Sequence, residues 1–377
     1  MSIQPTVSAP RPTTAPVTRS RIVGVDTARG LAIIGMFVAH LSLVRDTGLF
    51  TATGWHWLAD GRSSALFATL AGVGVAFMTK RAYTTAAPQE WSVQRIRLLK
   101  RAGIVFVLGW ILTMFGTPVA VILGSYAMLF VLVIPFIKLR PAALLGWAAA
   151  VVVVMPPLLL TSAYYLLGGA DPYTYDTAGH LLIMVPIVGD LWAGYYPALS
   201  WLSYILVGLA VGRLGLTRPL VQVALVAAGV LVAGAGYLPG LALEWETTGL
   251  ARDLVTIAPH ADTTFEIIGN IGVAVAILGV CLLIASLAPL RVLLFPISAM
   301  GSMSLTVYCA QIVVIAALGA DVVWDPQSNW PLIWLTMGSM IFASGWMAIF
   351  DRGPLERLLA IMTRTRPGAP SAVPYAG

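Results

Sequence analysis

Long apolar runs separated by short polar segments dominate the pattern of hydrophobic and polar positions along this chain. Each run is close to the length of about 20 apolar residues that a helix needs to cross a bilayer. We expect about ten spans, near residues 28–45, 63–79, 101–117, 121–137, 142–167, 196–214, 219–239, 266–288, 303–320 and 331–350. The pattern predicts an all-α fold, a polytopic transmembrane helical bundle. The fifth run contains Pro156 and Pro157, so we expect it to be kinked or broken there.

Three regions are expected along the chain. Residues 1–20 are rich in Pro, Thr, Ser and Ala, which is typical of a disordered tail. Residues 21–362 form the transmembrane domain, and residues 363–377 form a second disordered tail. The first apolar run ends without a small-residue cleavage site in the right place, so we interpret it as a retained span and not as a signal peptide.

Basic residues predict the orientation of the bundle. If alternate loops are cytoplasmic, 19 of the 22 Lys and Arg residues fall on that side, and only Arg45, Arg62 and Arg252 fall on the other. Lys and Arg accumulate in cytoplasmic loops. We therefore expect both termini in the cytoplasm and an even number of spans. The long outer loops, 46–62, 168–195 and 240–265, are rich in aromatic residues, which either serve function or form an interfacial belt.

Composition supports a membrane protein and excludes several other classes. Hydrophobic residues make up 59% of the chain and charged residues 10%, with a mean hydropathy of +0.88. A soluble domain is about 25% charged, so lipid must cover most of this surface. The net charge of +6 follows the topology, which argues against nucleic-acid binding. Cys281 and Cys309 lie in apolar stretches without metal-ligand spacing, and we expect no metal.

The first span carries three ionisable residues on one helical stripe. Asp26 and Arg29 are three residues apart, and His40 follows eleven residues later on nearly the same face. Ionisable groups at membrane depth are costly, and they are functional by default. The alternatives are a structural ion pair for Asp26 and Arg29, and an interfacial histidine for His40.

Two outer loops carry further candidates. Trp55, His56 and Trp57 precede Asp60 and Arg62, and a loop histidine near a carboxylate can act as a general base. A second cluster includes His260, Thr263 and Glu266, which suit a polyol acceptor or, alternatively, a hydrophilic helix cap.

A cytoplasmic basic run precedes the third span, at Arg95, Arg97, Lys100 and Arg101. It suits the phosphates of a nucleotide-like cofactor or a topology anchor on anionic lipid. The sequence contains no Walker loop, no GxSxG and no HExxH, which argues against ATP-driven pumping by this chain.

Several motifs occur in an order that resembles the YeiB-like membrane proteins. The first are Asp26-x-x-Arg29-Gly30-Leu-Ala and Gly61-Arg62-x-x-Ala-Leu-Phe67-x-x-Leu-x-Gly72. Then follow Ile122-Leu-x-x-Tyr126-Ala, Tyr196-Pro197-Ala-Leu-x-Trp201-Leu-x-Tyr204, Gly208-Leu-Ala-x-Gly212-Arg213-Leu, Gly301-Ser-Met-Ser304-Leu305-Thr306-x-Tyr308 and Gly353-Pro354-Leu-Glu356. The group resembles a branch of the superfamily that contains heparan-α-glucosaminide N-acetyltransferase and the acyltransferase-3 proteins. Val121 and Gln311 depart from the pattern, which has an acidic residue and often a histidine there.

This resemblance implies that residues 21–362 are an acyltransferase-like domain. Enzymes of the superfamily take an acyl group from cytosolic acyl-CoA and place it on a sugar across the membrane. Acyltransferase-3 proteins have a histidine where His40 stands, whereas the heparan enzyme has its catalytic histidine five residues before a glycine, as His56 is before Gly61. Because His40 lies on the same helical stripe as Arg29, we favour His40 over His56 as the general base.

The resulting expectation is a membrane-embedded acyltransferase that moves an acyl group, expected to be acetyl, to an extracytoplasmic sugar, envelope glycan or lipid. The catalytic candidates are His40, His56 and Asp60, and acyl-CoA would be held by Asp26, Arg29, Arg95, Arg97, Lys100 and Arg101. The acceptor would meet Trp55, Trp57, Arg62, Tyr196, Trp201, His260, Thr263 and Glu266. Expected partners are membrane lipids, a sugar or glycolipid acceptor and a second copy of the chain, in a bacterial cytoplasmic membrane. The alternatives are a secondary transporter or permease and, third, a scaffold for envelope assembly.

Overall fold

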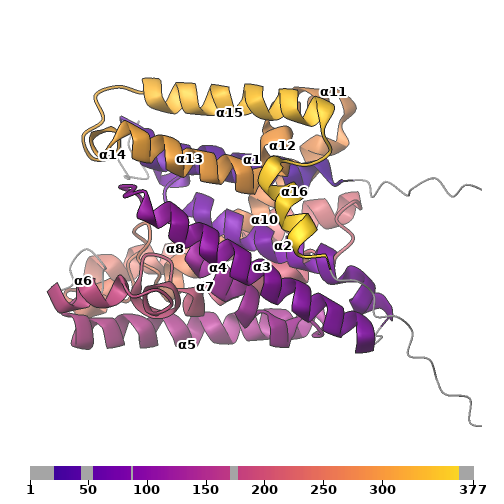
Figure 1. Cartoon of the computed structure of the whole chain (residues 1–377). Helices are drawn as coiled ribbons and strands as arrows, with labels where there is room; N and C mark the ends of the chain where they lie inside the picture. The colour runs from indigo at the N-terminus through magenta and orange to yellow at the C-terminus, as the bar shows by residue number, and fades with distance from the viewer. Residues whose placement is uncertain (1–20, 44–53, 86–87, 170–176, 365–377) are drawn as a thin grey trace, which may run out of the picture.

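The computed structural model describes residues 21–43, 54–85, 88–169 and 177–364 (Figure 1). These residues form helices and turns, and no strand occurs among them, so the all-α fold class is confirmed. The long helices are α1 (Val23–Leu41), α2 (Arg62–Thr85), α3 (Pro88–Met114), α5 (Pro141–Leu167), α8 (Pro219–Glu246), α10 (Thr264–Ser286) and α15 (Trp330–Ile349). The predicted tail 1–20, most of the tail 363–377 and parts of two outer loops, at 46–53 and 170–176, lie outside the described residues.

Shorter helices complete the bundle. They are η1 (Gly54–Leu58), α4 (Leu123–Leu132), η2 (Ile134–Phe136), α6 (Thr177–Ile183), η4 (Gly189–Ala193), α7 (Ala198–Val211), α9 (Leu250–Asp253), α11 (Ala288–Leu293), α12 (Phe295–Ser302), α13 (Ser304–Leu318), α14 (Asp321–Trp324) and α16 (Pro354–Met362). Every apolar run that the sequence predicts to be a span therefore contains a helix.

By length and apolar composition, 6 helices among the described residues can cross a membrane, namely α1, α2, α5, α8, α10 and α15. The helices α12 and α13 meet at 86° and count as a seventh span if they cross together. The helix α3 is long, but the basic run in its first half shortens its apolar part. The helices α4 and α7 are shorter than a span requires. The count of ten spans therefore stays a prediction.

The first and last described residues lie at the same end of the bundle, on the right in Figure 1. The guanidinium of Arg21 donates a hydrogen bond to the backbone oxygen of Asp351, which ties the start of the described chain to the segment between α15 and α16. We call this the inner end. The opposite end, which holds α6 and α14, we call the outer end (Figure 1).

Single cysteines can test which membrane side each end faces. In a variant without the two native cysteines, Ala178→Cys and Val255→Cys should react with an impermeant thiol reagent in intact cells, because the charge distribution predicts that the outer end is extracytoplasmic. Ser92→Cys should react only after permeabilisation. Labelling of position 92 but not of position 178 in intact cells would reverse the assignment.

Glycines allow the central helices to approach at backbone contact. A Cβ added to Gly208 of α7 would lie 1.8 Å from the backbone oxygen of Thr69 in α2, and one added to Gly72 would lie 2.2 Å from that of Ile205. Small residues at such crossings are a common device of membrane helices. The crossing of α2 and α7 therefore requires glycine on both helices.

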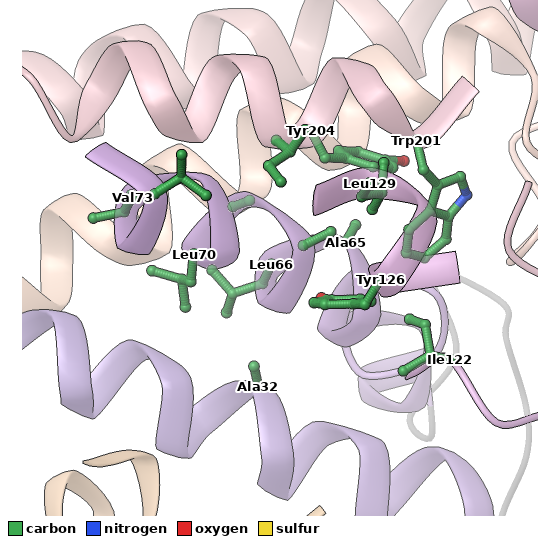
Figure 2. Close-up of a cluster of buried hydrophobic side chains, with 14 of the residues drawn as sticks. Ala32, Ala65, Leu66, Leu70, Val73, Ile122, Tyr126, Leu129, Trp201 and Tyr204 are labelled. Atoms are coloured by element: carbon green, nitrogen blue, oxygen red, sulfur yellow. The ribbon is translucent and has the colours of Figure 1, made fainter. Parts of the chain in front are cut away.

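The core lies where α1, α2, α4 and α7 meet. Figure 2 shows Leu66 and Leu70 of α2 directed toward the side of Ala32 in α1, with the buried Tyr204 and Trp201 of α7 on the other side of α2. The helix α4 packs against α3 and α7, and the ring of Tyr126 contacts that of Phe67 in α2, so the first turn of α4 lies deep inside the bundle. This position of α4 determines the geometry of the site described below.

The helix α5 continues through Pro156 and Pro157, so the predicted break does not occur. Proline lacks an N–H and leaves the backbone oxygen four residues earlier without its helical donor. For Pro156 that oxygen belongs to Val152, and the hydroxyl of Thr264 donates a hydrogen bond to it at 2.9 Å. The free carbonyl of α5 therefore anchors the first residue of α10, beside the outer site.

Candidate active site

One buried carboxylate organises the turn that precedes α10. Oε1 of Glu266 accepts a hydrogen bond from the backbone N–H of His260 (3.0 Å), and Oε2 accepts one from that of Asp262 (2.7 Å). Thr263 caps α10, because its hydroxyl oxygen accepts the N–H of Glu266 at 3.0 Å. His260 and Asp262 have φ angles of 61° and 52°, a left-handed conformation that costs free energy outside glycine. Glu266 and Thr263 therefore use their side chains to hold the turn before α10 in its conformation.

Asp60 lies beside two histidines that come from distant parts of the chain. Its Oδ1 is 3.6 Å from Nε2 of His260, and His56 of η1 lies close enough to interact with it electrostatically. His56 is buried, and the side chains of Asp60 and His260 are largely buried. A carboxylate beside an imidazole orients the ring and stabilises the imidazolium that forms when the ring takes a proton. The three residues form a group with the chemistry of a general acid–base catalyst.

Arg62 holds the two outer loops together. Its Nη1 donates to the backbone oxygen of Asp60 at 3.1 Å, and its Nη2 donates to that of Ile257 at 2.9 Å. The guanidinium carbon lies 3.8 Å from the ring centroid of Trp57, in a cation–π contact. Arg62 and Trp57 are both buried. Arg62 and Trp57 contact each other, and Arg62 also binds backbone oxygens of both loops. These contacts fix Asp60 next to the turn of His260.

Aromatic side chains surround His260. Its ring centroid lies 4.6 Å from that of Tyr195 and 5.5 Å from that of Tyr196. Nε1 of Trp201 donates to Oδ1 of Asp262 at 2.6 Å. Burial raises the pKa of Asp262 well above its usual value, and the indole N–H partly offsets this by stabilising the carboxylate. The structure thus brings Tyr196, Trp201 and His260 together, and their assignment to an acceptor stays a prediction.

An outer cavity of about 490 Å³ opens beside these aromatic residues. Tyr195 and Tyr196 form one wall, and Asp190 of η4 lies within it. Oδ1 of Asp190 is 3.3 Å from the hydroxyl of Ser125, and burial raises the pKa of Asp190. Further lining residues include Trp110, Thr113, Thr117, Met184 and Trp324. A carboxylate inside a cavity with aromatic walls suits a ring that carries hydroxyl or amine groups.

An inner cavity lies on the other side of the core and widens toward the inner end. Its deep part, about 260 Å³, is lined by Arg29, Arg101 and Glu356, and its shallow part is about 500 Å³. The two parts share Met78, Arg101, Ser302, Ser304, Leu305 and Glu356, and the shallow part adds Arg21, Arg97, Arg352 and Arg364. Glu356 accepts hydrogen bonds from the first turn of α13. The arginines therefore outnumber the acids, and the cavity suits an anionic ligand.

The basic run of α3 divides between two faces. Arg97 and Arg101 line the inner cavity, whereas Arg95 and Lys100 are exposed and line neither of its parts. Arg29 lines the deep part, and its Nη1 is 3.1 Å from Oδ1 of Asp26. Of the residues that the sequence assigns to the donor, Arg29, Arg97 and Arg101 thus meet in one cavity, with Asp26 as the partner of Arg29.

The first turn of α4 separates the inner cavity from the outer cavity. Leu123 and Tyr126 line the deep part of the inner cavity, while Gly124 and Ser125 line the outer cavity. A Cβ added to Gly124 would lie 2.3 Å from Oδ1 of Asp190, so glycine is needed for η4 to approach. The two cavities are therefore one helical turn apart.

His40 lines neither the inner nor the outer cavity. His40 is half-buried in the last turn of α1, next to segment 44–53, which lies outside the described residues. The side chain of Trp55 is also outside the described part of the chain. Across residues 21–43, 54–85, 88–169 and 177–364, no three His, Cys, Asp or Glu side chains are grouped as a metal site needs.

Sequence reasoning missed several cavity residues. Asp190 follows a Gly in an outer loop, without a neighbouring motif that marks it. Tyr126, Tyr308 and Glu356 belong to separate motifs of the YeiB-like pattern, yet all three line the inner cavity. Their shared presence in that pattern is the signal that could have grouped them.

Comparison with known families gives two matches. Residues 21–234 match the model of the heparan-alpha-glucosaminide N-acetyltransferase catalytic domain. Residues 211–366 match a family described as a protein of unknown function (DUF418). No curated protein matches the chain. The first match contains His56, Asp60, the basic run and every residue given for the outer cavity except Trp324. The second contains the turn of His260 and the inner residue Glu356.

Proposed function

We propose that this chain, which belongs to the heparan-α-glucosaminide N-acetyltransferase catalytic family, transfers an acyl group from cytosolic acyl-CoA to an acceptor on the far side of the membrane. The chain is a helical membrane protein of an acetyltransferase-related family. The observation that carries the proposal is the pair of cavities, one rich in arginine and one aromatic, at opposite faces of a single turn of α4. An acyl group therefore needs to move only a short way between them.

The inner cavity is the proposed donor site. Acyl-CoA carries phosphates, which bind guanidinium groups through charge-assisted hydrogen bonds. Arg97 and Arg101 lie where the cavity widens toward the inner end, and Arg29 lies deeper. The nucleotide would occupy the wide part, and the thioester would reach the narrow part near α4. The exposed residues Arg95 and Lys100 would instead contact anionic lipid headgroups.

The outer cavity and the adjoining His–Asp group form the proposed acceptor site. Tyr195 and Tyr196 separate the outer cavity from His260 and present aromatic faces to a sugar ring. We propose His56 as the general base, since Asp60 lies beside it and its place before Gly61 matches the pattern of the heparan enzyme. The acceptor would be a sugar or glycolipid of the envelope, and the membrane a bacterial cytoplasmic membrane.

The proposed step balances as a single acyl substitution. The acceptor oxygen or nitrogen forms a bond to the thioester carbonyl carbon, and its proton passes to His56. The carbon–sulfur bond then breaks, and the CoA thiolate leaves into the inner cavity with a proton from the imidazolium. Asp60 stabilises that imidazolium while it exists.

The test is acyl transfer by the purified protein in nanodiscs. The donor is acetyl-CoA with a labelled acetyl group, and the acceptors are hexoses, hexosamines and extracted envelope lipids. We expect saturable binding of acetyl-CoA and a labelled acetyl product. Binding without a product for any acceptor class, together with uptake of the acceptor into proteoliposomes, would favour the secondary transporter. The bent pair of α12 and α13 is the observation that supports this second candidate.

Asp190 provides a specific test of the acceptor side. Asp190→Asn should raise the acceptor KM by about 10–150-fold with little change in kcat, because it removes a charged hydrogen-bond partner worth about 1.5–3 kcal/mol. The pKa of Asp190 is raised by burial, so the charged form is lost as pH falls through that raised pKa. Acceptor binding should therefore weaken toward acidic pH in the wild type and not in Asp190→Asn. An unchanged KM across the same pH range would remove Asp190 from the acceptor site.

A further inference from the structure

Tyr126 is a buried tyrosine whose hydroxyl lacks a partner. The residue is 5% exposed, and its hydroxyl makes no hydrogen bond within the part of the chain that the structure describes. A hydroxyl that is buried in this way costs free energy unless another group completes its hydrogen bonding. Tyr126 lines the deep part of the inner cavity, so a ligand in that cavity can reach it.

The ring of Tyr126 is held firmly in place. Its centroid lies 5.6 Å from that of Phe67 and 6.4 Å from that of Phe130. Figure 2 shows the ring packed near Ala65 and Leu66 of α2. The other tyrosine of this cavity, Tyr308, differs in that its hydroxyl oxygen already accepts the N–H of Ile122 at 3.1 Å. Tyr126 is thus a rigid hydroxyl donor that is still available to a ligand.

Tyr126 also lies at the boundary between the two cavities. It is within electrostatic range of Arg29, which lines the inner cavity, and of Tyr196, which lines the outer cavity. The residues just before it, Gly124 and Ser125, face the outer cavity. Tyr126 therefore belongs to the helical turn that separates the two cavities, on its inner side.

We propose that the Tyr126 hydroxyl donates a hydrogen bond to the carbonyl oxygen of the acyl thioester, a role that rests on the proposed acyltransferase function. When the acceptor attacks the carbonyl carbon, negative charge develops on this oxygen, and the hydrogen bond strengthens. When the carbon–sulfur bond breaks, the carbonyl re-forms and the charge leaves with the CoA thiolate. Tyr126 keeps its proton throughout.

The first test is kinetic. Tyr126→Phe keeps the ring and removes only the hydroxyl, so kcat should fall by about 10²-fold, the effect of losing one oxyanion donor. The Kd for acetyl-CoA and the thermal stability should stay close to wild type. The matched control is Tyr165→Phe, the same change at a residue that is 73% exposed, which should leave kcat unchanged. An unchanged kcat in Tyr126→Phe would overturn the proposal.

The second test needs no acceptor. Infrared difference spectra of bound acetyl-CoA, labelled with ¹³C at the carbonyl, should show a lower carbonyl stretching frequency in the wild type than in Tyr126→Phe. If acetyl-CoA does not bind the wild type at all, the proposed function itself fails. If it binds and both proteins give the same frequency, Tyr126 does not contact the thioester, and the proposed function stands without it.

Discussion

Replacing His56 with alanine should lower the turnover of acyl transfer by about 10²–10⁴-fold, which is the usual contribution of a general base. The acceptor KM should change little, because a base acts on the proton that moves in the transition state and not on ground-state binding. The reason lies in the outer site, where Asp60 and His56 interact and Arg62 fixes the loop that holds Asp60. The measurement is kcat and KM with labelled acetyl-CoA and an acceptor from the transfer assay.

Two other histidines serve as matched controls for His56→Ala. His260→Ala removes the imidazole on the other side of Asp60 and the ring that packs on Tyr195 and Tyr196. Its loss should raise the acceptor KM and lower turnover less than the loss of His56. His40→Ala changes a half-buried residue at the end of α1, and turnover should stay near wild type.

The pattern of results separates three mechanisms. A large loss of turnover in His40→Ala, with His56→Ala near wild type, would identify His40 of α1 as the base. That is the assignment favoured by the helical stripe that Arg29 and His40 share. A large loss only in His260→Ala would move the base to the turn before α10. If all three variants keep full turnover, none of these histidines is the base. The interpretation as a secondary transporter is then favoured over the interpretation as an acyltransferase.

The helical class could be predicted from the sequence, because the length and apolarity of each run directly constrain a chain that lies in lipid. The apolar runs constrain the number of spans less strictly than they constrain the helical class. The predicted run 196–214 contains α7, a buried helix of 14 residues, and the run 303–320 contains α13, which meets α12 at 86°. Hydropathy records burial in protein and burial in lipid alike, so it does not distinguish a short internal helix from a span.

Part of the outer site could also be predicted from residue types. A histidine, a carboxylate and aromatic residues in outer loops suggested a common site, and the structure brings His56, Asp60 and His260 together. The motif glycine at 61 has a φ of 70°, and a Cβ there would lie 3.4 Å from the backbone nitrogen of His260. A side chain at this position would therefore strain the turn that sets the spacing from His56.

The sequence could not show which of these side chains face a cavity and which are held by contacts within the protein. Glu266 and Trp201 have side chains that suit a sugar, yet both are engaged with the turn of Asp262. In the same way, Arg95 and Arg101 look equivalent in the basic run, but only Arg101 faces the cavity. These assignments depend on which face of a helix meets α4 and α13, and pairwise spacing within one segment does not contain that information.

Arg29→Gln should weaken the binding of acetyl-CoA by about 1.5–3 kcal/mol, a factor of about 10–150 in Kd, the range for hydrogen bonds to charged groups. Arg29 lines the deep part of the inner cavity, and the change keeps a polar side chain while it removes the charge. Isothermal titration of the nanodisc protein measures the Kd. Lys100→Gln is the matched control, since it removes a charge from the basic run at an exposed position, and it should leave Kd unchanged at physiological ionic strength.

The competing role of Arg29 is structural, as the partner of Asp26 at 3.1 Å within the first turns of α1. Asp26→Asn distinguishes the two roles. If Arg29 binds a phosphate, Asp26→Asn leaves the guanidinium in the cavity with its charge intact, and acetyl-CoA should bind much more tightly to it than to Arg29→Gln. If Arg29 only pairs with Asp26, both variants should lose thermal stability by a similar amount, and both should bind acetyl-CoA as the wild type does. That second result would leave Arg97 and Arg101 as the guanidinium groups that hold the donor.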